Sequence, residues 1–140
     1  MDSPLILSFS EFINPATALV VDTILFTVPT GAEYEVMEVI ECHTVAGTNG
    51  SDVTALITKM ASGVALGSGT TITASTFNLK STADVPVSKS AANGGLSSDP
   101  NVRRLRSGER LAVNFTGTMT ALEGMNLTLV LKRLRSAEYR

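Results

Sequence analysis

The fold class is decided by residues 110–131, which read RLAVNFTGTMTALEGMNLTLVL. The first third of this stretch alternates between two sets of side chains, an inward set of Leu111, Val113 and Phe115 and an outward set of Ala112, Asn114 and Thr116. The last third places four apolar side chains on one face, Met125, Leu127, Leu129 and Leu131. Because side chains of a β-strand point alternately to opposite faces, each part predicts a half-buried strand. The connection Gly117–Gly124 predicts a hairpin between the two strands.

Other strand-like runs precede this stretch and are separated by Gly, Asn, Pro and Ser. The three longest cover residues 19–28, 34–45 and 53–60. Residues 47–50 predict a hairpin between the last two of them. Residues 85–88 predict an edge strand, because Pro86 has no amide hydrogen to donate to a sheet. Residues 71–79 fit either a strand or an irregular connection, and residues 91–100 have the composition of a loop.

Six to eight short strands and no capped helical pattern favour an all-β fold. The expected architecture is an antiparallel β-sandwich of jelly-roll type, with an immunoglobulin-like sandwich or a small closed barrel as alternatives. A chain of 140 residues is long enough to bury one hydrophobic core without disulfides or metal. We expect the sandwich to span residues 19–135, and residues 136–140 to form a solvated tail.

The first 18 residues differ from the rest, because Pro4 and Pro15 bracket an apolar segment without clean alternation. The apolar residues of this segment are Leu5, Ile6, Leu7, Phe9, Phe12 and Ile13. Two interpretations are open. Residues 1–18 are either the first strand of the sandwich or an arm that docks on a neighbouring subunit.

Charge is sparse and unevenly distributed. Charged residues make up 17% of the chain, against about 25% on average, and a weakly charged exterior is typical of a surface that is covered in the working state. No Lys or Arg precedes Lys59, whereas basic residues predominate after Val102, where Arg103, Arg104 and Arg106 form a cluster. Either the N- and C-terminal strands lie side by side and pair their charges, or acidic and basic faces of separate copies meet. The cluster itself fits a solvated loop or a contact with an acidic protein surface.

The sequence offers little chemistry for catalysis. The only histidine, His43, follows Cys42, and neighbours on a strand point to opposite faces, so the two do not form a nucleophilic pair. We expect Cys42 to be a buried apolar residue, His43 to lie on the sheet surface, and the acids Glu33, Glu35, Glu38 and Glu41 to form a solvated face. No nucleophile elbow or phosphate loop is present. We therefore expect no catalytic residues, no metal and no cofactor.

The same features limit the expected partners. Interleaved aromatic residues are missing around the arginine cluster and the net charge is −2, so direct binding to nucleic acid is not expected. No apolar run approaches the roughly 18 residues of a membrane span, and no basic N-terminal leader is visible. A cytoplasmic site of synthesis is expected.

Four segments carry a resemblance to a known family. They are TILFTVPTG at residues 23–31, the strand-like run 34–44, LRSGERLAVNFTGT at residues 105–118 and LTLVLKR at residues 127–133. Together they resemble small tailed-bacteriophage virion proteins with a jelly-roll β-sandwich, in particular head decoration (cement) proteins, with related sandwiches in fibre and tail-tip modules. The resemblance spans about residues 19–134.

This resemblance implies a non-enzymatic virion structural protein on the capsid exterior, made in the host cytoplasm. It implies a homotrimer bound to the major capsid protein at local symmetry axes, where it bridges neighbouring subunits and stabilises the shell. The family has no shared catalytic motif, so no active-site residue is carried over. The expected contacts are the N-terminal apolar segment and the arginine cluster. The alternative function is a carbohydrate-binding attachment module of a fibre or tail tip, which needs exposed aromatic rings or a clustered polar pocket, and Tyr34 and Tyr139 are the only tyrosines.

Overall fold

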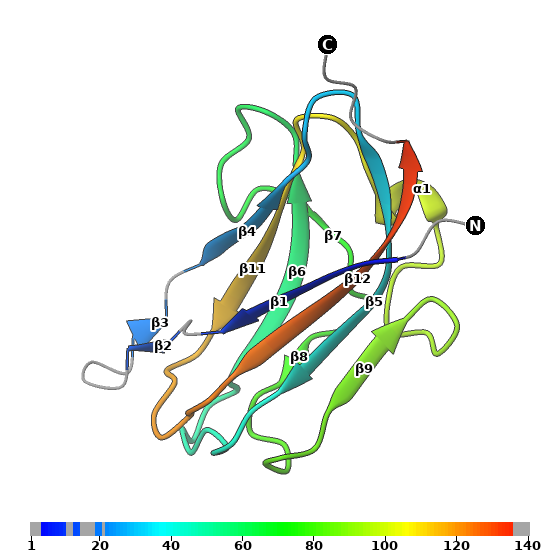
Figure 1. Cartoon of the computed structure of the whole chain (residues 1–140). Helices are drawn as coiled ribbons and strands as arrows, with labels where there is room; N and C mark the ends of the chain where they lie inside the picture. Colours follow the sequence, from blue (N-terminus) through cyan, green and yellow to red (C-terminus); the bar gives the residue numbers. More distant parts are fainter. Residues whose placement is uncertain (1–3, 11–12, 15–18, 21, 136–140) are drawn as a thin grey trace.

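Two antiparallel sheets packed face to face make up the computed structural model, which describes residues 4–10, 13–14, 19–20 and 22–135 (Figure 1). The first, named here the β12 sheet, has the order β1-β12-β5-β10, with β9 also pairing with β5. Its strands are β1 (Leu5–Ser10), β12 (Asn126–Arg135), β5 (Glu33–Cys42), β10 (Arg104–Leu105) and β9 (Val87–Ser90). The second, the β11 sheet, has the order β4-β11-β6-β7, with β8 also pairing with β6. Its strands are β4 (Thr23–Thr27), β11 (Arg110–Thr116), β6 (Thr54–Met60), β7 (Thr70–Thr71) and β8 (Phe77–Asn78).

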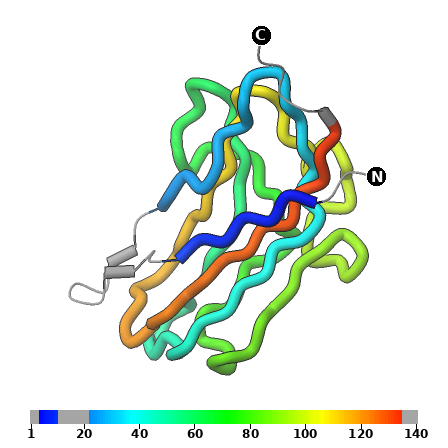
Figure 2. Tube along the Cα trace, viewed as in Figure 1, coloured from blue at the N-terminus to red at the C-terminus, as the bar shows by residue number. Residues whose placement is uncertain are grey.

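The strand order is that of a jelly roll. The first four long strands, β1, β4, β5 and β6, fall alternately in the two sheets, and then β11 lies between β4 and β6 while β12 lies between β1 and β5. The first and last strands of the β12 sheet lie next to each other, and the trace in Figure 2 shows the ends of the described chain meeting on that sheet. The expected all-β sandwich of jelly-roll type is therefore confirmed.

Both predicted hairpins are wrong. Residues 110–116 form β11 and the following strand forms β12, which lies in the opposite sheet. The segment 47–50 likewise belongs to a connection that crosses from β5 to β6. The two crossing connections lie against each other: Val45 forms a β-bridge with Glu123, and the Thr48 amide donates to the Thr120 carbonyl at 2.9 Å. Two strands that pair in one sheet and two strands that face each other across a core show the same alternation of apolar and polar residues. Alternation therefore does not reveal which strand is the hydrogen-bonded partner.

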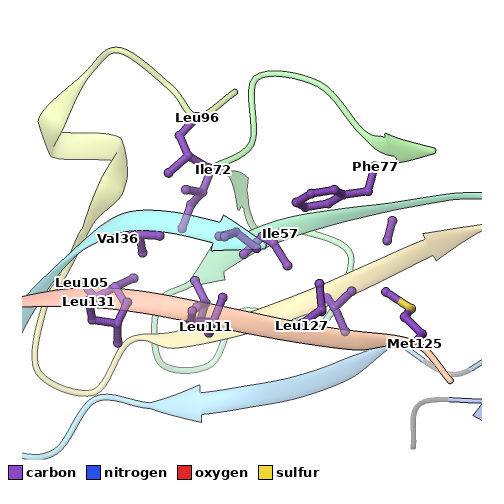
Figure 3. Close-up of a cluster of buried hydrophobic side chains, with 14 of the residues drawn as sticks. Val36, Ile57, Ile72, Phe77, Leu96, Leu105, Leu111, Met125, Leu127 and Leu131 are labelled. Atoms are coloured by element: carbon purple, nitrogen blue, oxygen red, sulfur yellow. The ribbon is translucent and has the colours of Figure 1, made fainter. Parts of the chain in front are cut away.

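The inner faces of the sheets form the apolar core (Figure 3). Four side chains of one predicted face are buried as expected, Met125, Leu127, Leu129 and Leu131. Leu111 and Val113 of β11 are buried opposite them, as predicted, and Phe115 is half-buried. Ala112 departs from the prediction, because it is buried although it belongs to the other face. Its neighbours across the sheet are Ile24 and Thr58, whose larger side chains cover a methyl group.

A β-bulge in β5 decides which residues of that strand reach the core. The register with β12 shifts between Val130, which pairs with Glu38, and Leu131, which pairs with Val36, so Met37 is the additional residue. Before the bulge, Tyr34 and Val36 are buried; after it, Val39 and Glu41 are buried. Since a strand has a side-chain period of two, one extra residue switches the inward set from even to odd positions.

The remaining elements differ from the predictions in detail. The run 19–28 is divided between β3 (Leu19–Val20), which pairs with β2 (Ile13–Asn14), and β4. Residues 71–79 contribute parts of two-residue strands, β7 and β8. The predicted edge strand at 85–88 is present as β9, two residues farther along, and pairs with β5 alone. A one-turn helix, α1 (Pro100–Arg103), was not predicted; the Asp99 side chain caps it by accepting from the Asn101 amide.

Candidate interaction surfaces and a buried polar pair

The N-terminal apolar segment contains the longest regular sheet edge among the described strands. Leu5–Ser10 is β1, so these residues form the first strand of the sandwich rather than a free arm. Phe12 lies outside the described residues, and Ile13 belongs to β2. All six residues of β1 pair with β12 without a register shift, and no described strand pairs with the other edge of β1. The backbone donors and acceptors on that edge are open to another extended chain.

The other described edges are interrupted or short. Pro86 stands immediately before β9, β10 has two residues, and β7 and β8 have two residues each. The register of β4 with β11 shifts between Leu111 and Ala112. Short strands, proline and bulges are the devices by which proteins protect sheet edges from further pairing. Pro4 likewise stands immediately before β1, but the six residues of β1 themselves contain no proline, no bulge and no charged residue.

The outer face of the β12 sheet continues from this edge with few charges. Cross-strand register aligns two rows on that face, Ile6–Val130–Glu38–Ser90 and Ser8–Thr128–Ile40–Ser88. Glu38 is the only ionisable residue in these rows, and its carboxylate accepts a hydrogen bond from the Ser88 hydroxyl. Ile6 is 61% exposed. Apart from Glu38, the side chains in the two rows next to the open edge are therefore uncharged.

The arginine cluster pairs largely within the molecule. Helix α1 and β10 bring Arg103 and Arg104 beside the start of β5. The Arg103 guanidinium lies 2.9 Å from the Glu35 carboxylate and also donates to the Ser97 carbonyl, and Arg103 is 7% exposed. Arg104 pairs with Glu33. The expectation that the acidic and basic halves of the chain pair their charges in one molecule is confirmed for these two bridges. Arg106, by contrast, is exposed.

Glu41 and His43 form a polar pair inside the core, which corrects two predictions. His43 does not lie on the sheet surface: it is 1% exposed, as is Glu41, which was expected in a solvated face. The His43 Nδ1 atom lies 3.0 Å from both carboxylate oxygens of Glu41, and Nε2 lies 2.9 Å from the Ser81 carbonyl oxygen. Burial raises the pKa of Glu41, and the hydrogen bond and charge of His43 offset part of that rise. Sequence reasoning did not place the bulge at Met37, which turns both side chains inward.

Several other expected features are placed by the structure. Cys42 is only half-buried, on the outer face opposite Asn126, instead of fully buried. Tyr34 is buried with its ring edge-on to Phe26, so it is not an exposed platform for a sugar, and Tyr139 lies outside the described residues. The described residues contain no cluster of three or more His, Cys, Asp or Glu that is suited to hold a metal ion. Nowhere in the described part of the chain does a helix reach the length and hydropathy that crossing a membrane requires.

A small hollow of about 170 Å³ lies beside β6 and β7. Its lining is Leu56, Thr71, Thr73, Ala74, Ser75 and Thr76. The hydroxyl groups offer hydrogen bonds, but the lining contains neither an aromatic ring nor a titratable group. The Ser75 hydroxyl accepts a hydrogen bond from the Lys89 ammonium group, and none of the lining residues is a carboxylate or histidine that could serve as a general base.

Comparison of the sequence with known protein families and with curated proteins finds no match. Among solved structures, a chain of the T13 particle of infectious bursal disease virus is similar, with 12% identity and a TM-score of 0.38 over 92% of this chain and 31% of the viral chain. A chain from the Gx strain of that virus gives 13% identity and a TM-score of 0.38 over 99% of this chain and 34% of the viral chain. The present chain thus spans only a part of each viral chain. An overlap of this extent does not establish function, which has to be argued from this chain's own surface.

Proposed function

We propose that this protein is a non-enzymatic virion structural protein, a head decoration protein that stabilises a phage capsid by bridging neighbouring capsid subunits. The observation that carries the proposal is the open edge of β1, which is regular, uncharged and flanked by the exposed side chain of Ile6. The resemblance of four sequence segments to decoration proteins supports the same role. The fold alone does not, because jelly rolls serve many functions.

The binding mode that fits this edge is strand addition. An extended segment of the major capsid protein pairs with β1 by main-chain hydrogen bonds, and Ile6 is covered by apolar side chains of that partner. The outer face of the β12 sheet lies alongside, and Glu38 is the only ionisable residue in its two central rows, so a partner that covers this face has one carboxylate to pair. Arg106 is the arginine of the cluster whose exposed side chain is available to an acidic capsid surface.

Bridging follows from several such contacts acting together. The resemblance implies three copies around a local symmetry axis on the outside of the shell. Contacts that are weak singly then become strong, because each copy holds the others at a high effective concentration near their sites. The mass of the protein in solution, and of its complex with capsids, tests the trimer separately from the binding mode.

The deciding experiment places a charge on the open edge. Ile6→Lys puts an ammonium group where the partner strand docks, which is a natural means of blocking edge pairing. Binding to shells assembled from the major capsid protein of the same virus, measured by co-sedimentation, is expected to fall by at least about tenfold, equivalent to roughly 1.4 kcal/mol.

The matched control is Ile24→Lys, which changes an isoleucine that is 40% exposed on β4 of the other sheet. It is expected to leave capsid binding within about twofold of the wild type, since the outer edge of β4 is not the proposed contact. Far-ultraviolet circular dichroism checks that both variants fold. Equal binding by the Ile6 variant and the wild type would contradict the proposed binding mode.

A further inference from the structure

The buried pair of Glu41 and His43 has a hydrogen-bond geometry that requires a fixed number of protons. Nε2 of His43 faces the Ser81 carbonyl oxygen, which only accepts, so this nitrogen must carry a proton. Nδ1 faces both carboxylate oxygens of Glu41 at 3.0 Å, so a second proton must lie between the ring and the carboxylate. That proton belongs either to an imidazolium beside a carboxylate or to a carboxylic acid beside a neutral ring. In both forms the pair is neutral overall and holds two protons.

No neighbouring charge replaces the second proton. Across the sheet, β12 presents Leu127 and β9 presents Val87 to Glu41. The charged residue of β9, Lys89, directs its ammonium group to the Ser75 hydroxyl, and Glu123, whose backbone pairs with Val45, is exposed. The connection from β8 to β9, residues 79–86, packs on the pair and contains two charged residues. Lys80 directs its ammonium group to the Ser51 carbonyl, and Asp84 is exposed. His43 is the only group whose charge alters the pKa of Glu41.

The pair also fastens the β8–β9 connection to the end of β5. The Ser81 carbonyl accepts from the His43 ring, and the Asp84 amide donates to the His43 carbonyl at 2.8 Å. If the second proton is lost, the neutral ring carries a proton on only one nitrogen. With that proton on Nε2, the lone pair of Nδ1 faces the lone pairs of the Glu41 carboxylate; with it on Nδ1, the lone pair of Nε2 faces the Ser81 carbonyl oxygen. One of the two ring hydrogen bonds is then replaced by a repulsive contact in a site that excludes water.

We propose that one proton shared by Glu41 and His43 latches the β8–β9 connection onto β5, and that alkaline pH opens this latch. The inference goes beyond the proposed function and does not depend on capsid binding. The connection leads directly into β9, the edge strand on the opposite side of the β12 sheet from β1. Opening it frees that end of the sandwich while the rest of the core stays packed.

The sign of the effect follows from the protons bound in each state. In the unfolded chain a glutamate titrates near pH 4.3 and a histidine near pH 6.5, so the pair keeps only one proton above about pH 6.5. In the proposed latch the folded pair keeps two, a number that follows from its hydrogen-bond partners, and burial raises the pKa of Glu41 in the same direction. The raised pKa of the Glu41 carboxyl stabilises the folded state fully at acidic pH, and this stabilisation is lost as the pH rises through that raised pKa. Above about pH 6.5 folding takes up a proton, so the folding equilibrium constant falls by up to about tenfold per pH unit until the folded pair loses its proton.

The test compares Glu41→Gln with Glu38→Gln, two substitutions on the same strand that remove the same charge. A glutamine at position 41 donates its amide to Nδ1, while Nε2 still donates to the Ser81 carbonyl, so no shared proton is needed. Glu38 lies on the outer face and leaves the pair intact. Urea unfolding is measured for both variants and the wild type between pH 6 and pH 9.

As the pH rises above about 6.5, the folding equilibrium constants of the wild type and of Glu38→Gln are expected to fall by up to about tenfold per pH unit relative to that of Glu41→Gln. Amide exchange at Asp84 is expected to accelerate with pH beyond its intrinsic rate in the same two proteins only. Parallel pH profiles for all three proteins would overturn the proposal.

The wild type provides a second test that needs no variant to fold. His43 is the only histidine, so nitrogen-15 NMR of the imidazole reports on this residue alone. At pH 8 we expect either two protonated ring nitrogens or an infrared band of a protonated carboxyl group. A neutral ring beside an ionised Glu41 would refute the shared proton.

Discussion

The two ends of β5 carry glutamates in opposite environments. At the start of the strand, Glu33 and Glu35 are half-buried and pair with arginines from the α1–β10 segment. At the other end, Glu41 is buried in the core and pairs with His43. The residue types are the same, and the sequence between them is uninterrupted by proline or glycine. What separates the two ends is the bulge at Met37, so a local backbone irregularity determines the electrostatic environment of every side chain beyond it.

Deleting Met37 is the most severe way to break this contrast. Without the extra residue, one half of β5 must turn over, which expels either Tyr34 and Val36 or Val39 from the core. We expect the loss of a cooperative urea transition, or a cost above about 4 kcal/mol. Met37→Gln is the control, because the side chain is exposed and its exchange should stay within about 0.5 kcal/mol. A deletion variant as stable as this control would show that the bulge is dispensable.

His43→Ala removes the partner of the core glutamate. The carboxyl of Glu41 is then buried without a hydrogen-bond donor from the ring, and we expect a cost of about 3–5 kcal/mol in urea denaturation at neutral pH. Replacing both residues, as Glu41→Met with His43→Leu, is expected to come within about 1 kcal/mol of the wild type, since a buried pair adds little over apolar packing. If His43→Ala lowers the free energy of unfolding by less than about 1 kcal/mol, the prediction is wrong, and the Glu41 carboxyl is hydrated in that variant.

Substitutions at the arginine end are expected to be mild and graded by exposure. Glu35→Gln leaves the nearly buried Arg103 with a weaker partner, and we expect a loss of about 1–2 kcal/mol. Glu33→Gln affects side chains that are 38% and 21% exposed, and we expect at most about 1 kcal/mol, reduced further by 1 M salt. Both losses should be independent of pH between 6 and 9, because arginine does not titrate there. A larger effect at Glu33 than at Glu35 would contradict this order.

Much of the fold was accessible from the sequence because burial and charge leave local signatures. Period-two alternation identified the inward residues of β11 and β12, and the segregation of acids and bases indicated that the two halves of the chain meet. The hydrogen-bonded partner of each strand could not be predicted, because the alternation of side chains does not depend on which strand lies alongside. The length of the connection 117–124 was a usable warning, because tight hairpins have loops of about two to five residues.

The environment of His43 was predicted wrongly for a different reason. The inward-facing set of β5 changes at one extra residue, Met37, and the alternation of apolar and polar residues does not locate it. From the bulge onward, every prediction of facing depends on where that residue lies. The open edge of β1 could not be predicted either. A strand is an edge strand because it lacks a second neighbour in the sheet, and the sequence of a strand does not show which strands lie beside it.

The adjacency of β1 and β12 has a consequence for synthesis. A ribosome makes Leu5–Ser10 before Asn126–Arg135, the strand that lies beside it, so this apolar segment stays without that partner while the intervening residues are made. Chains growing side by side on one messenger are exposed to mutual strand exchange during that interval, and the pairing of β1 within its own chain waits until β12 has been made.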